Sequence, residues 1–303
     1  MYKLSKETKG ILFALLSYLL WGFLSLYWKL LSHVEAYQSF SYRIVWTLVT
    51  MSFYILISNR TKFFKSQMKT LSSSKKASFS ILLAGIFISI NWVTYIWAVG
   101  HGQATEASLG YYMMPLASVL LSIIFLKEKL SLAAKLSVLL AFCGVAYLVF
   151  QTGHVPFVSL ILALSFSIYG LIKKNVTLSS DASMLVEAII ILPLALFYIL
   201  VISKTPLSHY TFTENILLAF SGIVTAIPLL LFAEGVKRAP LNKIGFIQYI
   251  NPTIQLCIAV SIFKEPFDKS SFLGFLLIWI AIFLFAIGQF LEGKSIKQNE
   301  LME

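Results

Sequence analysis

The chain contains YMMPLASVLLSIIFLKE at residues 112–128 and a related stretch, YINPTIQLCIAVSIFKE, at residues 249–265. Tyrosine, proline and the closing Lys-Glu pair recur at matching places, each 137 residues later in the chain. Both stretches end long apolar runs, which are typical of membrane-spanning helices. The repeat therefore predicts that the chain is built from two related halves.

The composition places this chain in a lipid bilayer rather than in water. Hydrophobic residues make up 58% of its 303 residues and charged residues 12%, whereas soluble globular proteins carry about 25% charged residues. The formal net charge is +11. In a soluble protein that charge would favour a nucleic-acid partner, but here the basic residues lie between apolar runs, where they set the topology. We therefore expect no nucleic-acid partner.

Apolar runs of about twenty residues, the length that crosses the hydrocarbon core, predict ten transmembrane helices. Counted over the connectors and the two tails, nineteen Lys and Arg fall on one face and four on the other, with Arg43 inside a span. Because cations in short loops stay on the cytoplasmic side, we expect a multi-pass cytoplasmic-membrane protein with both termini in the cytoplasm. The predicted spans are 10–31, 38–58, 78–99, 104–126, 132–150, 156–174, 182–203, 214–236, 241–263 and 271–291.

The positions of the repeated Lys-Glu pairs set the relation between the two halves. The first pair follows an even-numbered span and the second an odd-numbered span, so the copies face opposite sides of the bilayer. We predict an all-α integral membrane protein with ten transmembrane helices in two inverted five-helix repeats, residues 1–150 and residues 151–303, the second with a short cytoplasmic tail. Inverted repeats are the usual architecture of secondary transporters, whose substrate site lies near the bilayer midplane between the repeats.

Two kinds of residue in the repeated stretches are candidates for that site. Tyr112 and Tyr249 approach the midplane by helical rise. Pro115 and Pro252 follow one turn later, and a proline frees a backbone carbonyl from the helical ladder. Each proline either offers that carbonyl to a cavity or makes a packing kink.

A polar stripe accompanies the second proline. Gln248, Asn251 and Gln255 share one face of a predicted span, and amides that faced lipid would be left without hydrogen bonds. They therefore either line a cavity or bond neighbouring helices, as polar side chains in membranes commonly do.

Large aromatic residues also lie deeper than the interfacial belt where tryptophan concentrates. Trp21 and its repeat counterpart Tyr169 could present flat faces to an organic substrate or a cation, or pack against neighbouring helices. The same two interpretations apply to a group on the third span. The predicted substrate-binding residues are Trp21, Asn91, Trp92, Tyr95, Tyr112, Tyr169, Gln248, Tyr249, Asn251 and Gln255.

Charged residues inside the spans suggest gates. Arg43 and Glu187 occupy equivalent places in the two halves, but inverted symmetry separates them by roughly 15 Å along the membrane normal. We therefore expect each to belong to its own gate or polar cluster, with Glu106 as a candidate partner for Arg43. The predicted gate or helix-kink residues are Arg43, Glu106, Pro115, Glu187 and Pro252.

Little in the sequence points to metal or enzyme chemistry. His33, His101, His154 and His209 all fall in outward-facing connectors, so an external pH or metal sensor is an open alternative, but they lack ligand spacing. Both cysteines lie in apolar runs, the candidate acids are scattered, and there is no P-loop. We expect no cofactor, no metal site and no enzymatic activity.

Several longer strings are similar to a known family: ALLSY (14–18), YWKL (27–30), YRIVW (42–46), NW (91–92), WAV (97–99), EASLGY (106–111), YGLI (169–172), PLLL (228–231) and QYINPT (248–253). Together they resemble the RarD-type permeases, a branch of the EamA group in the drug/metabolite transporter superfamily. The resemblance covers nearly the whole chain. It implies ten helices in two EamA-type halves and transport of a small molecule, without assigning a substrate.

These observations predict a secondary transporter, a permease or exporter that moves a small organic metabolite or drug by alternating access. Its expected partners are that solute, the lipid bilayer and a coupling ion if transport is driven by an ion gradient. The alternatives are a channel or regulatory membrane scaffold and, with less support, a multi-span membrane enzyme. The solute, the direction of transport and the oligomeric state are left open by these residues.

Overall fold

The computed structural model describes residues 5–100, 104–153, 155–203, 205–262, 264 and 272–300, and all regular structure in these ranges is helical. The helices of the first half are α1 Lys6–Leu30, α2 Ala36–Ile57, α3 Thr61–Ser73, α4 Lys75–Gly100, α5 Ala104–Leu126 and α6 Leu132–Thr152. Those of the second half are α7 Phe157–Asn175, α8 Ser180–Phe197, the π-turn η1 Tyr198–Ile202, the 3-10 turn η2 Leu207–His209, α9 Phe212–Arg238, α10 Leu241–Gln248, α11 Ile250–Ser261 and α12 Phe272–Glu300.

Eight helices in the described ranges are long and apolar enough to cross a membrane: α1, α2, α4, α5, α6, α7, α9, and α8 continued through η1. Their outer faces carry large apolar side chains. Phe53 is 62% exposed and Leu200 is 76% exposed, and in water each such side chain would forgo about 1.5–3 kcal/mol of burial free energy. A protein with such a surface is an integral membrane protein.

Local capping sets where several helices begin and end. Ser5 accepts a hydrogen bond from the backbone N–H of Thr8 at the start of α1. Thr211 and Glu214 form a reciprocal capping box at the start of α9, which satisfies backbone donors that a helix leaves free. Gly153 ends α6 with a φ of 71°, a left-handed conformation that glycine adopts without steric cost.

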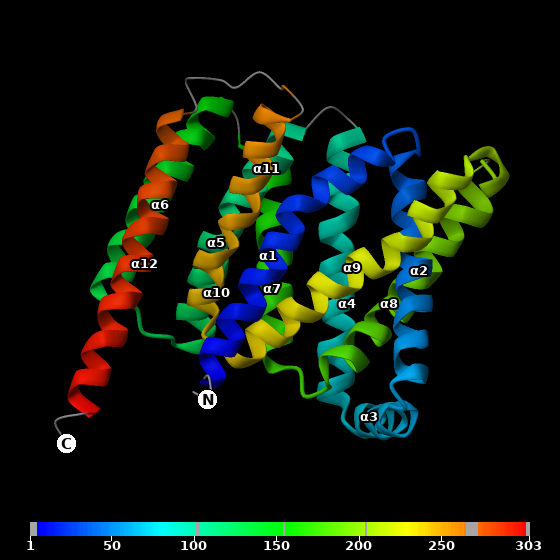
Figure 1. Cartoon of the computed structure of the whole chain (residues 1–303), viewed down its shortest axis with the longest axis horizontal. Helices are drawn as coiled ribbons and strands as arrows, with labels where there is room; N and C mark the ends of the chain where they lie inside the picture. Colours follow the sequence, from blue (N-terminus) through cyan, green and yellow to red (C-terminus); the bar gives the residue numbers. More distant parts are fainter. Residues whose placement is uncertain are drawn as a thin grey trace.

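Both chain ends lie on the same side of the molecule, together with α3 (Figure 1). We call this side the termini face. The opposite face carries the connector between α1 and α2, residues 31–35, and the turn η2 before α9. The predicted connector 59–77 contains helix α3, which has no buried residue, so its basic side chains extend from the termini face.

The repeated Lys-Glu motif lies at helix ends. Lys127 has a φ of 53° and Lys264 a φ of 57°, so both copies leave the helix through a left-handed residue. The carboxylate of Glu128 accepts the backbone N–H groups of Leu241 and Asn242, each at 2.9 Å. Glu128 thereby caps the first turn of α10, whereas its counterpart at 265 lies outside the described residues.

The two repeated prolines have different effects on their helices. Pro115 lies inside the continuous helix α5. The predicted span 241–263 is instead divided into α10 and α11 at Tyr249, three residues before Pro252, because a proline removes a helical hydrogen bond and its ring crowds the preceding turn. Within the described residues the predicted span 241–263 thus consists of two short helices.

Helices from the two halves of the chain pack against each other throughout the core. Contacts join α1 with α9 and α11, α2 with α8 and α9, α4 with α7 and α8, α5 with α7 and α10, and α6 with α12. Gly222 of α9 lies against the backbone carbonyl of Trp46 in α2 so closely that an added Cβ would overlap it. Small residues allow such close approach between membrane helices.

The Gly222→Val substitution is expected to destabilise the protein by about 1–3 kcal/mol, the usual cost of overpacking, because α2 and α9 would be forced apart. Thermal unfolding of the purified protein in detergent measures the effect. Ile223→Val is the matched control, because Ile223 is the next residue and is 38% exposed on the outer face. Equal melting temperatures for Gly222→Val and the wild type would contradict this packing.

Candidate functional site

One large cavity lies between the two halves of the chain, with a volume of about 660 Å³. It begins at the opposite face, where the α1–α2 connector contributes Ser32 and Glu35, and its wall reaches Tyr18, Phe166 and Thr225, which lie half-way along α1, α7 and α9. Ligand sites for small molecules commonly measure about 300–1,000 Å³. The cavity is therefore large enough for a small organic molecule.

Eight of the predicted residues line this cavity, and they come from α1, α2, α4, α10 and α11. They are Trp21, Arg43, Asn91, Trp92, Tyr95, Gln248, Asn251 and Gln255. Sequence reasoning missed several other wall residues, above all Tyr111, Phe40 and Thr225. Tyr111 is the sequence neighbour of Tyr112, which was predicted to bind substrate. Tyr111 lines the cavity, whereas Tyr112 does not.

Three predicted tyrosines lie away from the cavity wall. Tyr112 is buried and donates a hydrogen bond to the carbonyl of Pro252 at 3.2 Å, and Tyr249 is buried in the same cluster beside α6 and α12. Tyr169 stacks on Phe232 and donates to Glu187 at 3.0 Å. The depth of Tyr112 and Tyr249 was predicted from helical rise, and Tyr169 was chosen as the repeat counterpart of Trp21. Neither argument says which way a side chain faces around its helix.

Two predicted acids and the prolines also lie off the wall of the cavity among the residues described. Pro115 and Pro252 belong to the α5–α10–α11 contact region rather than to the lining. The backbone carbonyl of Glu106 accepts a hydrogen bond from Ser159 at 2.5 Å. Glu187 lies on the termini side of the cavity and is described with its partners below.

The amide residues serve both functions that the sequence left open. Asn91 donates to the carbonyl of Leu162 at 2.9 Å and to Ser165 at 3.1 Å, and so links α4 to α7. Gln255 donates to the side-chain oxygen of Asn251 at 2.9 Å within α11, and to the backbone carbonyl of Trp21 in α1 at 3.5 Å. These contacts bond the helices, and the same side chains line the cavity.

Arg43 is surrounded by aromatic rings on the cavity wall. Its guanidinium carbon lies 4.5 Å from the ring centre of Trp92, 5.3 Å from that of Phe40 and 5.5 Å from that of Trp28. Its Nε is buried without a hydrogen-bond partner. In the described ranges no carboxylate lies within ion-pair distance of Arg43, so the pairing with Glu106 that the sequence suggested is not seen.

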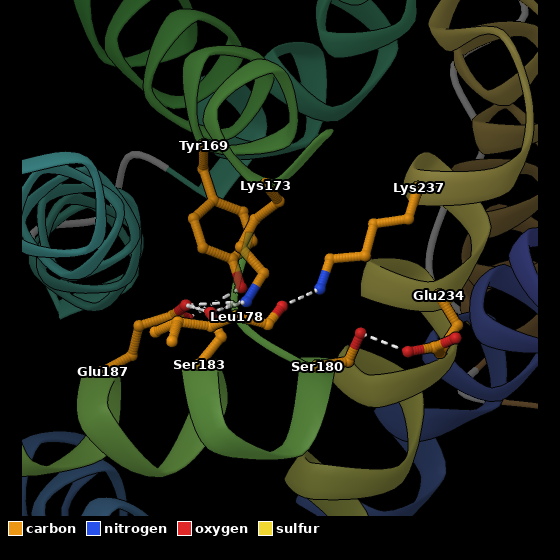
Figure 2. A network of polar contacts seen from close by, with 8 residues as sticks. All are labelled: Tyr169, Lys173, Leu178, Ser180, Ser183, Glu187, Glu234 and Lys237. Atoms are coloured by element: carbon orange, nitrogen blue, oxygen red, sulfur yellow. Dashed lines mark hydrogen bonds and ion pairs between the residues drawn. The ribbon is translucent and has the colours of Figure 1, made fainter. Parts of the chain in front are cut away.

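A buried polar network lies between the cavity and the termini face. The ammonium group of Lys173 is 2.7 Å from the carboxylate of Glu187 and 2.6 Å from the hydroxyl of Ser183. Lys173 is 1% exposed and Glu187 is 5% exposed. Figure 2 shows Lys173 and Tyr169 of α7 pointing toward Glu187 and Ser183 of α8. As predicted, Glu187 is not paired with Arg43.

The network extends from α8 to α9. Lys237 donates a hydrogen bond to the backbone carbonyl of Leu178, and Ser180 donates to the carboxylate of Glu234, as Figure 2 shows. We call the set Tyr169, Lys173, Leu178, Ser180, Ser183, Glu187, Glu234 and Lys237 the closing network. It ties the termini-face ends of α7, α8 and α9 together.

Three further ion pairs reinforce the termini face. They are Arg60–Asp181 at 2.7 Å, Lys174–Glu128 at 3.6 Å and Lys243–Glu7 at 2.7 Å. Each pair connects two helices or their ends, α3 with α8, α7 with α5, and α10 with α1. The cavity is therefore open toward the opposite face and closed toward the termini face.

The histidines of the connectors predicted to face outward do not form a site in the part of the chain that the structure describes. His33 lines the mouth of the cavity, His209 lies beside Tyr210 in η2, and His101 and His154 lie outside the described residues. No cluster of His, Cys, Asp and Glu suited to a metal ion occurs among the described residues.

Comparison with known proteins places the chain in a family. The family model "EamA-like transporter family" matches residues 8–150 and again residues 155–287. "Uncharacterized transporter YojE" of Bacillus subtilis is 43% identical over 97% of this chain and 99% of its own length. "Protein RarD" of Salmonella typhimurium is 36% identical and that of Escherichia coli 34% identical, each over 93% of this chain and 96% of its own length.

The fold is also similar to that of a solved crystal structure. The TM-score is 0.72 at 18% sequence identity, and the match covers 93% of this chain and 99% of the other. Similarity at this identity concerns the fold alone. The sequence relatives carry the assignment, and they confirm the resemblance found in the sequence. The chain belongs to the EamA-like transporter family, in its RarD-type branch, and is a membrane transporter.

Proposed function

We propose that the protein is a secondary transporter that moves a small organic solute by alternating access. The observation that carries this proposal is the single large cavity in the described residues that opens at one face and is closed at the other by the closing network. A transporter that exposes its site to one side at a time has this form. An open channel would need a continuous path across the closed side.

The proposed architecture is ten spans in two inverted repeats, residues 1–150 and 151–303. The eight long helices supply eight spans, α10 with α11 the ninth and α12 the tenth. Helix packing supports the repeats, because exchanging the halves maps the α1–α9 contact onto α7–α4, and the α5–α7 contact onto α11–α1. The α2–α8 and α6–α12 contacts map onto themselves, as a two-fold axis requires.

The proposed substrate site is the part of the cavity wall between the middle of the helices and the opposite face. It comprises Trp21, Asn91, Trp92, Tyr95, Gln248, Asn251 and Gln255. Aromatic faces would contact the apolar part of the solute, and the amides can both donate and accept hydrogen bonds. The wall combines apolar and aromatic side chains with polar groups, and ligand sites commonly use apolar surface for contact and polar groups for orientation.

Opening the termini face would require the closing network to separate. Its contacts are hydrogen bonds and ion pairs, which can be exchanged for bonds with water when a passage forms. The interruption of the helix at Tyr249, between α10 and α11, provides a place where one half could bend without breaking a continuous helix. Discontinuous helices beside the substrate site are common in secondary transporters.

We also propose that the termini face is cytoplasmic and that the membrane is the cell membrane. Lys62, Lys65 and Lys69 belong to α3, which lies on this face. Clusters of cations near the bilayer are retained on the cytoplasmic side, where anionic lipid attracts each by about 1 kcal/mol.

Transport itself is tested in two steps. Untargeted metabolite comparison of medium and cell extract, between a deletion strain and a complemented strain, should reveal a solute that changes compartment. The purified protein in liposomes should then move that solute with saturable kinetics. Failure to move any solute from a broad panel under any gradient would contradict the proposal, and a flux that never saturates would favour a channel.

The orientation is tested by labelling single cysteines with an impermeant maleimide on intact cells, after Cys143 and Cys257 have been replaced by alanine. His33→Cys at the cavity mouth should be labelled from outside, and Lys62→Cys in α3 only after the cells are permeabilised. Labelling of Lys62→Cys on intact cells would place the termini face outside.

The closing network is tested with Lys173→Met, which leaves the carboxylate of Glu187 buried without its counter-charge. We expect a loss of about 3–5 kcal/mol in stability. The double variant Lys173→Met/Glu187→Met should recover most of it, because a buried ion pair can often be replaced by apolar residues without loss. Thermal unfolding measures stability, and Lys62→Met on exposed α3 is the control.

Transport measurements on the same variants distinguish an effect on opening of the closing network from an effect on protein stability. The double variant should fold but transport at least tenfold more slowly, because its apolar closure cannot exchange contacts with water. The single variant Glu187→Met completes the cycle. If the stability losses of Lys173→Met and Glu187→Met simply added in the double variant, Lys173 and Glu187 would not act as a pair.

A further inference from the structure

We propose, on the basis of the proposed transport function, that the solute is a small organic monoanion whose carboxylate binds Arg43. This assigns a substrate class to the cavity. The assignment follows from the charges on the cavity wall, the surroundings of Arg43 and the shape of the remaining wall.

Arg43 lies deep enough to meet a solute inside the membrane. It is the eighth residue of α2, which begins at the opposite face, so helical rise places it about 10 Å along the span. A guanidinium at such depth is unfavourable unless it is compensated. Functional ionisable groups in membrane spans characteristically mark the path of a solute.

The rings around Arg43 compensate only part of that cost. Trp28, Phe40 and Trp92 each contact the guanidinium through a ring face, but ring faces do not accept its five N–H bonds in the plane of the fork. The buried Nε has no hydrogen-bond partner. A carboxylate in the cavity matches the guanidinium fork with two parallel hydrogen bonds and opposite charge, so it supplies the counter-charge that the surrounding residues lack.

The other titratable groups of the described wall do not neutralise Arg43. Glu35, at the mouth, accepts the backbone N–H groups of Tyr37 and Gln38 and the hydroxyl of Tyr198, so its charge caps α2. His33 also lies at the mouth, whereas Tyr95 and Tyr111 are neutral phenols. Among the described lining residues no second basic side chain lies beside this cation, so the site suits one negative charge better than two.

The rest of the wall defines the body of the anion. Trp21 and Phe166 form an aromatic surface, with their ring centres 5.7 Å apart. Gln248 and Asn251 add amide groups on the facing helices. The predicted solute thus has a carboxylate at one end, an apolar or aromatic body, and room for a hydrogen-bonding group. No described carboxylate in the middle of the cavity would receive a primary ammonium group.

Binding to purified protein in detergent tests this without any transport step. Phenylacetate, 2-phenylethanol, phenethylamine and phenylalanine share one ring and differ in charge, and a wider panel pairs other monocarboxylates with their alcohols. Quenching of tryptophan fluorescence reports binding. At least one monocarboxylate should bind tenfold or more tightly than its alcohol and than the matching amine.

Variants of Arg43 link that preference to the site. Arg43→Gln should weaken carboxylate binding at least tenfold and leave the alcohol within twofold of wild type, which also shows that the cavity is intact. Arg43→Lys keeps the charge but not the fork and should give an intermediate loss. Lys62→Gln removes a cation from exposed α3 and should change nothing, which excludes an effect of net charge.

Each outcome decides the proposal. It is overturned if no monocarboxylate in the panel binds more tightly than its alcohol, or if Arg43→Gln binds the carboxylate as wild type does. The transport function would stand in that case, provided a neutral or cationic solute moves in liposomes. Conversely, carboxylate binding that depends on Arg43, with no transport of any solute, would support the site and reject the transporter proposal.

Discussion

A charge inside a membrane protein needs a partner, because the surrounding hydrocarbon offers no water to solvate it. This constraint applies near the termini face, where Lys173 and Glu187 neutralise each other. Ser183 and Tyr169 complete the hydrogen bonds of the pair. The helices that carry these groups must stay together for the charges to remain satisfied. The closed side is therefore held by polar contacts rather than by apolar packing alone.

On the side of the molecule that contains the cavity, the buried charge has a different kind of neighbour. Arg43 is enclosed by aromatic rings instead of a carboxylate among the described residues, and it lies beside a space of about 660 Å³. The termini side and the cavity side of the molecule thus differ in how their buried charges are balanced. On the termini side the counter-charge is another side chain, whereas on the cavity side a bound molecule can provide it. That difference distinguishes a structural ion pair from a recognition group.

The spans were largely predictable, because apolar runs of fixed length leave few alternatives in a bilayer. The polar stripe of Gln248, Asn251 and Gln255 was also found, since amides cannot face lipid. The sequence could not give the rotation of each helix, and so it chose Tyr112 where Tyr111 lines the cavity. The sequence did not indicate that Lys173 is buried. It lies near the end of a span, where a lysine is usually an exposed cation that sets the orientation of the helix.

Closure at the termini face also affects where the membrane voltage falls across the protein. A water-filled cavity that reaches the middle of the helices carries the potential of the opposite solution inward, so the membrane voltage would fall mainly across the closing network. Moving one charge through the full field is worth about 2.3 kcal/mol per 100 mV. For a charged solute, voltage would then act chiefly on the rearrangement of the closed half and only weakly on occupancy of the cavity.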